Sequence, residues 1–211
     1  MNAVTAPRLQ IVILAAGFSS RLGRPKALAR VHGLSLLRRT LTLAAGLTSA
    51  KVIVVVPRRA ARVAVEARGL RVALTVNPLR ADGLSSSVRR GIIKARHSSA
   101  LLLLPVDMAT LQRRDVARLI SRWRAAPRRV IARLVERHAG TPQGGIPLIL
   151  PRWLYARARG LQGDIGLRQL VGGLPADQRV LLNLPSAAQD VDTPQDLRAA
   201  RRRLRASSTS L

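Results

Sequence analysis

The sequence contains no cysteine and few aromatic side chains, and both shortages limit what the protein can do. Without cysteine it forms no disulfide, no zinc–thiolate site and no cysteine nucleophile. Aromatic residues make up 2% of the 211 residues, so the core must consist of Leu, Val, Ile and Ala. His32, His97 and His138 lack the spacing of metal ligands, and we expect them to be ordinary surface or helix-end residues.

Long hydrophobic runs are also absent. The apolar stretches near Ile11, Val52 and Leu101 are far shorter than the roughly 20 residues that a membrane-spanning helix needs. The opening residues, MNAVTAPRLQ, lack the apolar segment of a secretory signal peptide. We therefore expect a protein without a membrane span, located in the cytoplasm.

Acidic residues are scarce, since 10 stand against 37 basic ones and the net charge is +27. Such a charge attracts nucleotides, nucleic acids or anionic membranes. However, the aromatic platforms that bind single strands are missing, and no nucleic-acid-binding motif is present. Much of the excess is arginine beside alanine, a pattern that GC-rich codon usage also produces. We expect no specific nucleic-acid partner, and each acidic residue at a strand end becomes informative.

The most informative stretch is residues 11–26, IVILAAGFSSRLGRPK. Its apolar first half predicts a strand buried on both faces in a parallel sheet, and ligands bind beyond the carboxyl ends of such strands. The glycine-containing loop that follows has no acidic residue, and Arg21 and Lys26 suit phosphate oxygens. A surface turn with solvated charges is the alternative. The spacing matches neither Walker A nor the dinucleotide motif G-x-G-x-x-G.

The rest of the chain alternates between apolar runs and amphipathic segments. Strands are expected at 51–56, 71–76, 100–107, 129–135 and 179–184, and helices at 34–46, 58–68 and 111–126. This alternation predicts an α/β fold with a parallel, doubly wound sheet. The last residues, 207–211, are expected to form a disordered tail.

The stretch 11–26 resembles the L-A-A-G-x-S-x-R-x-G-x-x-K signature of MobA-like nucleotidyltransferases, a family that includes the molybdenum cofactor cytidylyltransferases. The matching residues are Leu14, Ala15, Ala16, Gly17, Ser19, Arg21, Gly23 and Lys26. The resemblance implies one Rossmann-like α/β domain over residues 1–206, with a mostly parallel sheet and helices on both faces. It also implies that these residues bind a nucleotide, with Arg21 and Lys26 on its β- and γ-phosphates.

Two later segments are similar to the family's nucleotide and metal sites. NPLRADGLSSSVRRG resembles a segment that lies against base and ribose, which implies nucleotide binding by Arg80, Ser86 and Ser87. Capping of the following helix is the simpler role of a serine there. Asp107 ends a buried strand where the family has a metal-binding aspartate, although Ala109 replaces the family's proline. An ion pair with nearby arginines is the alternative role of Asp107.

Two further segments resemble the acceptor side of the family's site. GTPQGGIPLIL is similar to the family's G-x-P segment, which implies acceptor contacts from Gly145 and Pro147, but it lacks the basic residues of the common Arg-Gly-His-Pro run. LQGDIGLR matches L-x-G-D-x-G-x-R and adds Asp164 and Arg168 to the acceptor-binding set. Capping of the helix that follows is the simpler role of Asp164, and solvation is the simpler role of Arg168.

The segment DVDTPQDL closely copies the family's D-x-D-T-P-x-D-L. Thr193 and Asp196 have a structural explanation, because their spacing is that of a capping box at the start of a helix. Asp190 and Asp192 have none. The resemblance implies that Asp107 and Asp190 bind Mg²⁺, with Asp192 supporting them or replacing Asp190 as the ligand.

The reaction implied by the resemblance is transfer of an NMP unit from an NTP to a phosphorylated acceptor, with release of pyrophosphate. In the resembled family, Leu-Ala-Ala-Gly in the first motif accompanies transfer from CTP, and Leu-Ala-Gly-Gly accompanies transfer from GTP. The methyl group of Ala16 is expected to crowd a purine base. CTP is therefore expected in preference to GTP, with molybdopterin as acceptor and a molybdoenzyme or its maturation chaperone as a partner. The alternatives are a sugar-1-phosphate nucleotidyltransferase and a non-catalytic nucleotide-binding protein, which the departures at Ala109 and Ile146 would motivate.

Overall fold

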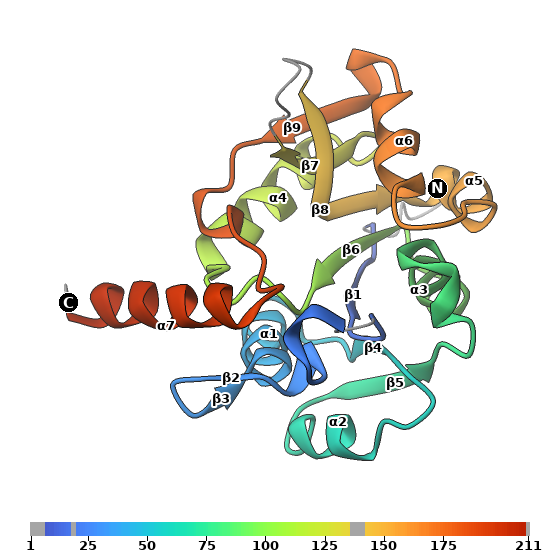
Figure 1. The fold of residues 1–211 in the computed structure, drawn as a ribbon. Helices are drawn as coiled ribbons and strands as arrows, with labels where there is room; N and C mark the ends of the chain where they lie inside the picture. Colours follow the sequence, from blue (N-terminus) through green and yellow to red (C-terminus); the bar gives the residue numbers. More distant parts are fainter. Residues whose placement is uncertain (1–6, 18–19, 136–141, 210–211) are drawn as a thin grey trace.

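The computed structural model describes residues 7–17, 20–135 and 142–209. Its centre is a seven-stranded sheet in the order β5-β4-β1-β6-β8-β7-β9 (Figure 1). The strands are β1 Leu9–Leu14, β4 Val52–Val56, β5 Val72–Val76, β6 Ala100–Pro105, β7 Val130–Val135, β8 Gln143–Pro151 and β9 Arg179–Leu182. Neighbours pair in parallel except around β8, which is antiparallel to both β6 and β7. The predicted Rossmann-like, mostly parallel sheet is confirmed.

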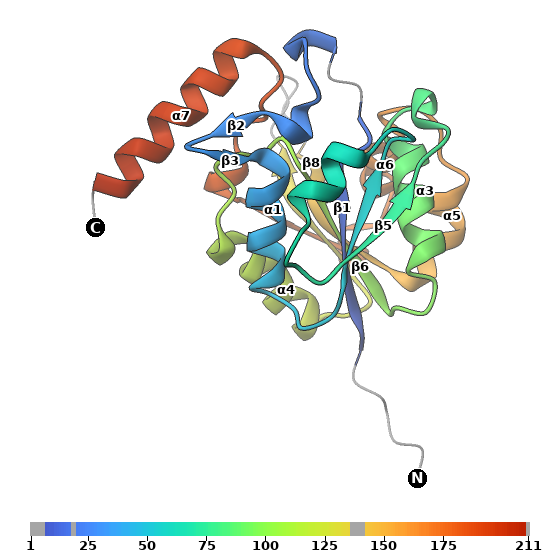
Figure 2. The same ribbon diagram turned by 90° about the horizontal axis from the view of Figure 1, so that it is seen from below.

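Helices cover both faces of this sheet (Figure 2). On one face lie α1 Leu36–Ala45, α2 Ala61–Glu66 and α4 Arg113–Ala125, and on the other lie α3 Leu84–Lys94, α5 Tyr155–Arg159 and α6 Gly166–Gly172. Successive residues of a strand point to opposite faces, so Ile11 and Ile13 pack with the first group, and Val12 and Leu14 with the second. This is why the strand is apolar without interruption.

Helix α2 is shorter than the expected helix at 58–68. It begins only at Ala61, so Arg58 and Arg59 lie in the connection between β4 and the helix rather than in the helix itself. The helix α4 is the one that the apolar spacing predicts, and its four expected core side chains are all buried: Val116, Leu119, Ile120 and Trp123.

A small third layer lies beside the main sheet. The hairpin β2 Arg30–Val31 and β3 Leu34–Ser35 packs with α7, Pro194–Thr209, in a separate apolar cluster. The far half of α7 extends away from the sheet (Figures 1 and 2). This helix continues through residues 207–209, which belong to the segment expected to be a disordered tail. None of the helices in the described ranges is long and apolar enough to cross a membrane.

The strand order places a topological switch point between β1 and β6. The chain passes from β1 outward to β4 and β5, and then returns to β6 on the other side of β1. Loops that leave the two neighbouring strands at a switch point diverge and open a crevice at their carboxyl ends. The loop after β1 and Asp107 after β6 both lie at this crevice. Short 3₁₀ turns complete the fold: Ser20–Leu22, Lys26–Leu28, Arg80–Asp82, Arg152–Leu154, Ala176–Gln178 and Pro185–Ala187.

Candidate nucleotide-binding site

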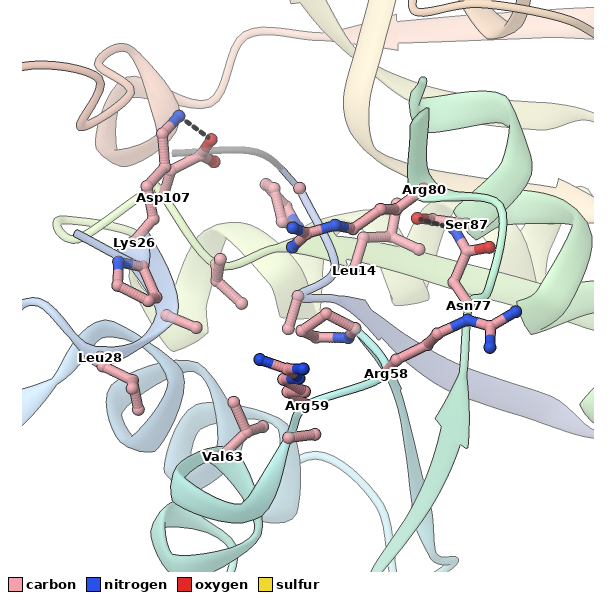
Figure 3. Close-up of a pocket in the computed structure, with 18 of the residues that line it drawn as sticks. Leu14, Lys26, Leu28, Arg58, Arg59, Val63, Asn77, Arg80, Ser87 and Asp107 are labelled. Carbon is pink, nitrogen blue, oxygen red and sulfur yellow. Dashed lines mark hydrogen bonds and ion pairs between the residues drawn. The ribbon is translucent and has the colours of Figure 1, made fainter. Parts of the chain in front are cut away.

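A cavity of about 1520 Å³ opens at the carboxyl ends of β1, β4, β5 and β6 (Figure 3). Its wall includes Leu14 at the end of β1, Ala15 directly after it, Pro57 after β4, Asn77 after β5 and Asp107 after β6. Seven basic side chains also line it: Arg21, Arg24, Lys26, Arg58, Arg59, Arg62 and Arg80. Pockets for single small molecules usually measure about 300–1,000 Å³, so this cavity has room for more than one substrate. Its chemistry suits polyanions.

The loop after β1 contributes Gly17, Arg21 and Lys26 to the cavity, as the phosphate-loop interpretation requires. Gly17 has open space where a side chain would point, and Gly23 adopts a φ of +68°, a conformation that favours glycine. The predicted nucleotide-binding residue Ser19 lies outside the described residues. Backbone and basic side chains of this loop therefore surround free space at the end of β1.

The expected role of the Ala16 methyl group does not agree with the structure. Ala16 is fully buried and packs in the apolar cluster beneath α3, and it is not part of the cavity wall. The neighbouring Ala15 lines the cavity instead. The two alanines point to opposite faces of the sheet, Ala15 into the cluster with α1, α2 and α4 and Ala16 into the cluster with α3, and only Ala15 also reaches the cavity wall.

Lys26 lies between two carboxylates. Its Nζ is 3.2 Å from Oδ2 of Asp107 and also contacts Oδ1 of Asp192, while Nη2 of Arg21 is 3.4 Å from Oδ2 of Asp192. Burial lowers the pKa of Lys26, but the attraction of Asp107 and Asp192 outweighs it, so the pKa lies above its ordinary value. The two cations predicted to bind phosphate are thus already neutralised by acids from the ends of two other segments.

A backbone hydrogen bond brings these acids together. The amide of Val191 donates to the carbonyl of Asp107 at 2.8 Å, which holds residues 190–192 against the end of β6. Oδ1 of Asp190 is buried and has no hydrogen-bond partner among the described residues. Burial raises the pKa of Asp190, as does the negative charge of Asp107, against the opposing effect of Arg133. Asp107 and Asp190 are therefore close enough for the charge of one carboxylate to affect the other.

This pair fits the magnesium ion that the family resemblance implies. Within the described ranges no group of three or more His, Cys, Asp or Glu side chains could hold a metal by itself. Mg²⁺ in nucleotide sites is typically held by one or two carboxylates, with substrate phosphates and water completing its shell. The hard oxygens of Asp107 and the buried oxygen of Asp190, which accepts no hydrogen bond from the described residues, match that donor set. Phosphate oxygens of a bound nucleotide and water would complete the shell of such a metal.

The predicted serines lie at the start of α3, where a residue that the sequence did not single out organises them. Nδ2 of Asn77 donates to Oγ of Ser86 at 2.8 Å and to Oγ of Ser87 at 3.0 Å. Ser87 lines the cavity, while Ser86 is buried behind it and donates to the carbonyl of Gly83 at 2.7 Å. Asn77 and Arg80 also line the cavity (Figure 3). A polar residue at the carboxyl end of a strand was the available signal for Asn77.

Asp164 caps a helix, but not the one that follows it. Its Oδ1 accepts a hydrogen bond of 2.7 Å from the amide of Leu84, the first residue of α3. The expectation that it caps α6 is therefore wrong. The expectation of a serine cap on α3 is also wrong, because the N-cap residue of α3 is Gly83. Gly83 has a φ of +79°, and a Cβ there would lie 2.7 Å from Oδ1 of Asp164. Asp164 also lines the cavity.

The remaining acceptor residues lie beyond β6. Gly145 and Pro147 are buried in β8, and Arg168 is exposed on α6. None of the three lines the cavity. Gly145 pairs across the sheet with Arg133 of β7, a buried arginine that the sequence reading passed over, although an arginine inside the apolar strand VIARLV was a visible signal.

Comparisons with known proteins give the family and agree with the fold. Residues 11–180 match the MobA-like NTP transferase domain. The fold is similar to the crystal structure of Rv0371c from Mycobacterium tuberculosis H37Rv, with 24% identity, coverage of 94% of this chain and 100% of that one, and a TM-score of 0.74. A manganese complex of Rv0371c gives 22% identity, 92% and 98% coverage, and a TM-score of 0.70.

Two other similarities are one of fold and one of a short stretch of sequence. CMP:2-keto-3-deoxy-manno-octonic acid synthetase complexed with CTP is 18% identical, with coverage of 95% of this chain and 99% of that one, and a TM-score of 0.72. The bifunctional IPC transferase and DIPP synthase of Rubrobacter xylanophilus is 50% identical over 82 residues, which are 36% of this chain and 19% of that protein. The alignment thus spans about a fifth of that curated relative. With a domain match that runs from β1 to β9, the chain belongs to the MobA-like NTP transferase family.

Proposed function

We propose that this nucleotidyltransferase moves CMP from CTP to a phosphorylated small molecule and releases pyrophosphate. The observation that carries the proposal is the cavity at the switch point, which is lined by basic loop residues and by Asp107, whose charge acts on nearby Asp190. A protein of similar fold is known in complex with CTP, and another in complex with manganese, which supports the choice of nucleotide and of a divalent metal.

In this proposal the nucleoside lies between the end of β1 and the start of α3. Ala15, directly after β1, lines the same cavity as Asn77 and Ser87, so the base and ribose would contact apolar, amide and hydroxyl groups there. The triphosphate would extend into the loop that carries Arg21 and Lys26. Their positive charges would bind the β- and γ-phosphates and stabilise the departing pyrophosphate.

Lys26 has to leave its carboxylates before it can bind phosphate. In the free protein its ammonium group neutralises Asp107 and Asp192. Asp107 and Asp190 would hold Mg²⁺, which when bound neutralises charge on the α-phosphate. With Asp107 engaged in that way, Lys26 turns to the nucleotide. Asp192 then keeps Arg21 in place, or replaces Asp190 in holding the cation.

The chemistry needs no protein nucleophile. An oxygen of the acceptor phosphate attacks the α-phosphorus in line, the bond from that phosphorus to the bridging oxygen of the β-phosphate breaks, and pyrophosphate carries the electron pair away. The protein contributes alignment of the two substrates and neutralisation of the charge that develops. The absence of cysteine is no obstacle to such a reaction.

Molybdopterin is our first candidate for the acceptor, on the basis of the family resemblance, with a molybdoenzyme or its maturation chaperone as the recipient of the product. The identity of 50% over 82 residues with the bifunctional IPC transferase and DIPP synthase favours a second candidate, which is the acceptor that this relative uses. We also propose the cytoplasm as the place of the reaction.

A pyrophosphate-release assay tests the proposal. Purified protein is incubated with Mg²⁺ and each of the four NTPs, with molybdopterin, with a sugar 1-phosphate, or without acceptor. We expect release with CTP and one acceptor, and little release from the Asp107→Asn variant. Binding of NTPs without turnover on any acceptor would support a non-catalytic protein instead. Failure to bind any NTP would refute the nucleotide site itself.

A further inference from the structure

Arg133 is the one lysine or arginine that is buried among the residues that the structure describes. It lies in β7 and is 8% exposed, in a protein whose other basic residues lie largely at the surface. Burial of a guanidinium is unfavourable unless its donors find partners. A buried arginine in a strand therefore requires an explanation from its surroundings.

The surroundings satisfy Arg133 only in part. Nη1 donates to the carbonyl of Ala187, but Nε is buried without a hydrogen-bond partner in the described part of the chain. Opposite Nη1, at 3.9 Å, lies Oδ1 of Asp190, which also has no hydrogen-bond partner there. That distance is too long for a hydrogen bond. Arg133 and Asp190 thus form an ion pair without a hydrogen bond between them. Nε of Arg133 and Oδ1 of Asp190 can each still form a hydrogen bond.

The position of Arg133 in the sheet shows which groups lie near its guanidinium. In the sheet order, β8 and β7 lie on the side of β6 away from β1, β4 and β5, whose ends surround the cavity. Asp107, at the end of β6, therefore stands between the cavity and Arg133, and the charges of Asp107 and Arg168 both act on the Arg133 guanidinium. Gly145 borders the guanidinium: a Cβ there would be in ordinary contact with Nε of Arg133 at 3.8 Å and would collide with Cγ2 of Val135 at 2.6 Å.

From this arrangement we infer that Arg133, together with Arg168, binds the phosphate of the acceptor and holds its oxygen beside Asp107 and Asp190. The inference rests on the proposed nucleotidyl transfer and adds a residue that neither the sequence motifs nor the family match assigns. A planar guanidinium fork suits two oxygens of one phosphate, and a second positive charge suits a dianion. The ligand class is a phosphate monoester, and it binds on the far side of Asp107 from the nucleotide.

Binding measurements with two probes test the inference. Methyl phosphate, the simplest phosphate monoester, is titrated into the full-length protein by calorimetry, and CTP with Mn²⁺ is titrated separately. We expect Arg133→Met to weaken methyl phosphate binding at least tenfold and to leave the dissociation constant of CTP–Mn²⁺ within twofold. Arg129→Met is the matched control, because it removes one exposed positive charge from the connection that leads into β7. It should change neither constant.

A second variant separates binding from folding. Arg133→Lys keeps the charge but loses the fork, so methyl phosphate should bind threefold to tenfold more weakly than to the wild type, with an unchanged melting temperature. If Arg133→Met does not fold, this variant alone decides the matter. Wild-type affinity in the variants, no methyl phosphate binding to the wild type at 20 mM, or an equal loss of CTP–Mn²⁺ affinity would each overturn the inference. If the wild type binds methyl phosphate but no NTP, the proposed function fails. The difference in methyl phosphate affinity between the wild type and the Arg133 variants then still decides whether Arg133 binds phosphate.

Discussion

Replacing Lys26 with methionine removes the cation from between two carboxylates and keeps the length of the side chain. The side chains of Lys26, Asp107 and Asp192 are 17%, 24% and 32% exposed. Exposed ion pairs contribute about 0–1 kcal/mol, and loss of one partner from a buried pair costs about 3–5 kcal/mol. The intermediate exposure suggests a loss of about 2 kcal/mol of unfolding free energy in metal-free buffer. For a protein of this size that lowers the melting temperature by about 4–8 °C.

The same variant should respond more strongly to a divalent cation. In the wild type, Mn²⁺ must displace the ammonium of Lys26 from Asp107, whereas in Lys26→Met that carboxylate is open. A ligand at ten times its dissociation constant stabilises the folded state by about 1.4 kcal/mol. We therefore expect Mn²⁺ to restore much of the lost stability of the variant and to change the wild type little. The affinity of the variant for CTP–Mn²⁺ should nevertheless fall by about tenfold or more, because it lacks the ammonium group that would bind the phosphates of CTP.

Melting curves by circular dichroism, with and without Mn²⁺, measure these effects. Lys94→Met is the matched control, because Lys94 is exposed at the end of α3 and the substitution is identical. Its melting temperature should stay within 1–2 °C of the wild type under both conditions. If Lys26→Met melts like the wild type without metal, or if Mn²⁺ shifts both proteins equally, the exchange between Lys26 and the metal does not occur.

Three further predictions concern other parts of the molecule. Asp107→Asn should lower the turnover number by about 100-fold or more while the protein stays folded, as measured by pyrophosphate release and melting; retained activity would remove Asp107 from the metal site. Gly83→Ala should destabilise the start of α3, because the new Cβ collides with Asp164, and should weaken CTP binding, whereas Gly172→Ala, with open space around it, should do neither. Burial raises the pKa of Tyr155 to about 12, with a hydrogen bond to Ser98 as an opposing effect, so the folded state keeps the phenol proton longer than the unfolded state does and unfolding free energy should fall between pH 10 and 12. The loss at pH 11 should be about 1.4 kcal/mol in urea titrations and absent in Tyr155→Phe; equal pH profiles would contradict it.

Features that depend on a few neighbouring residues were predictable from the sequence. The strand and loop at 11–26 follow from an apolar run that ends in glycine and basic residues, and both are where the sequence placed them. The capping box is equally local, since Asp196 accepts hydrogen bonds from the amide and hydroxyl of Thr193 and its own amide donates back to the Thr193 hydroxyl. Partners three residues apart on a helix start are already close before the chain folds.

Other features depended on which strand lies beside which. The sequence analysis expected no strand at 143–151, so β8, its antiparallel pairing and the pairing of Gly145 with Arg133 appear only in the folded sheet. The alternation of faces at the end of β1 likewise places Ala15 in one core cluster and Ala16 in the other, and only Ala15 also lines the cavity. A one-residue change of register would exchange the two.

The sequence by itself determined the α/β class, the phosphate loop and the strand-end acids, because each is a pattern of adjacent residues. Only the tertiary structure decided the partners of those groups. Lys26 meets Asp107 and Asp192, and Asp164 caps a helix that begins 80 residues earlier in the chain. A charged side chain binds whatever lies within about 3–4 Å of it, and for residues so far apart in sequence that neighbour is set by the order of the strands and the packing of the loops between them.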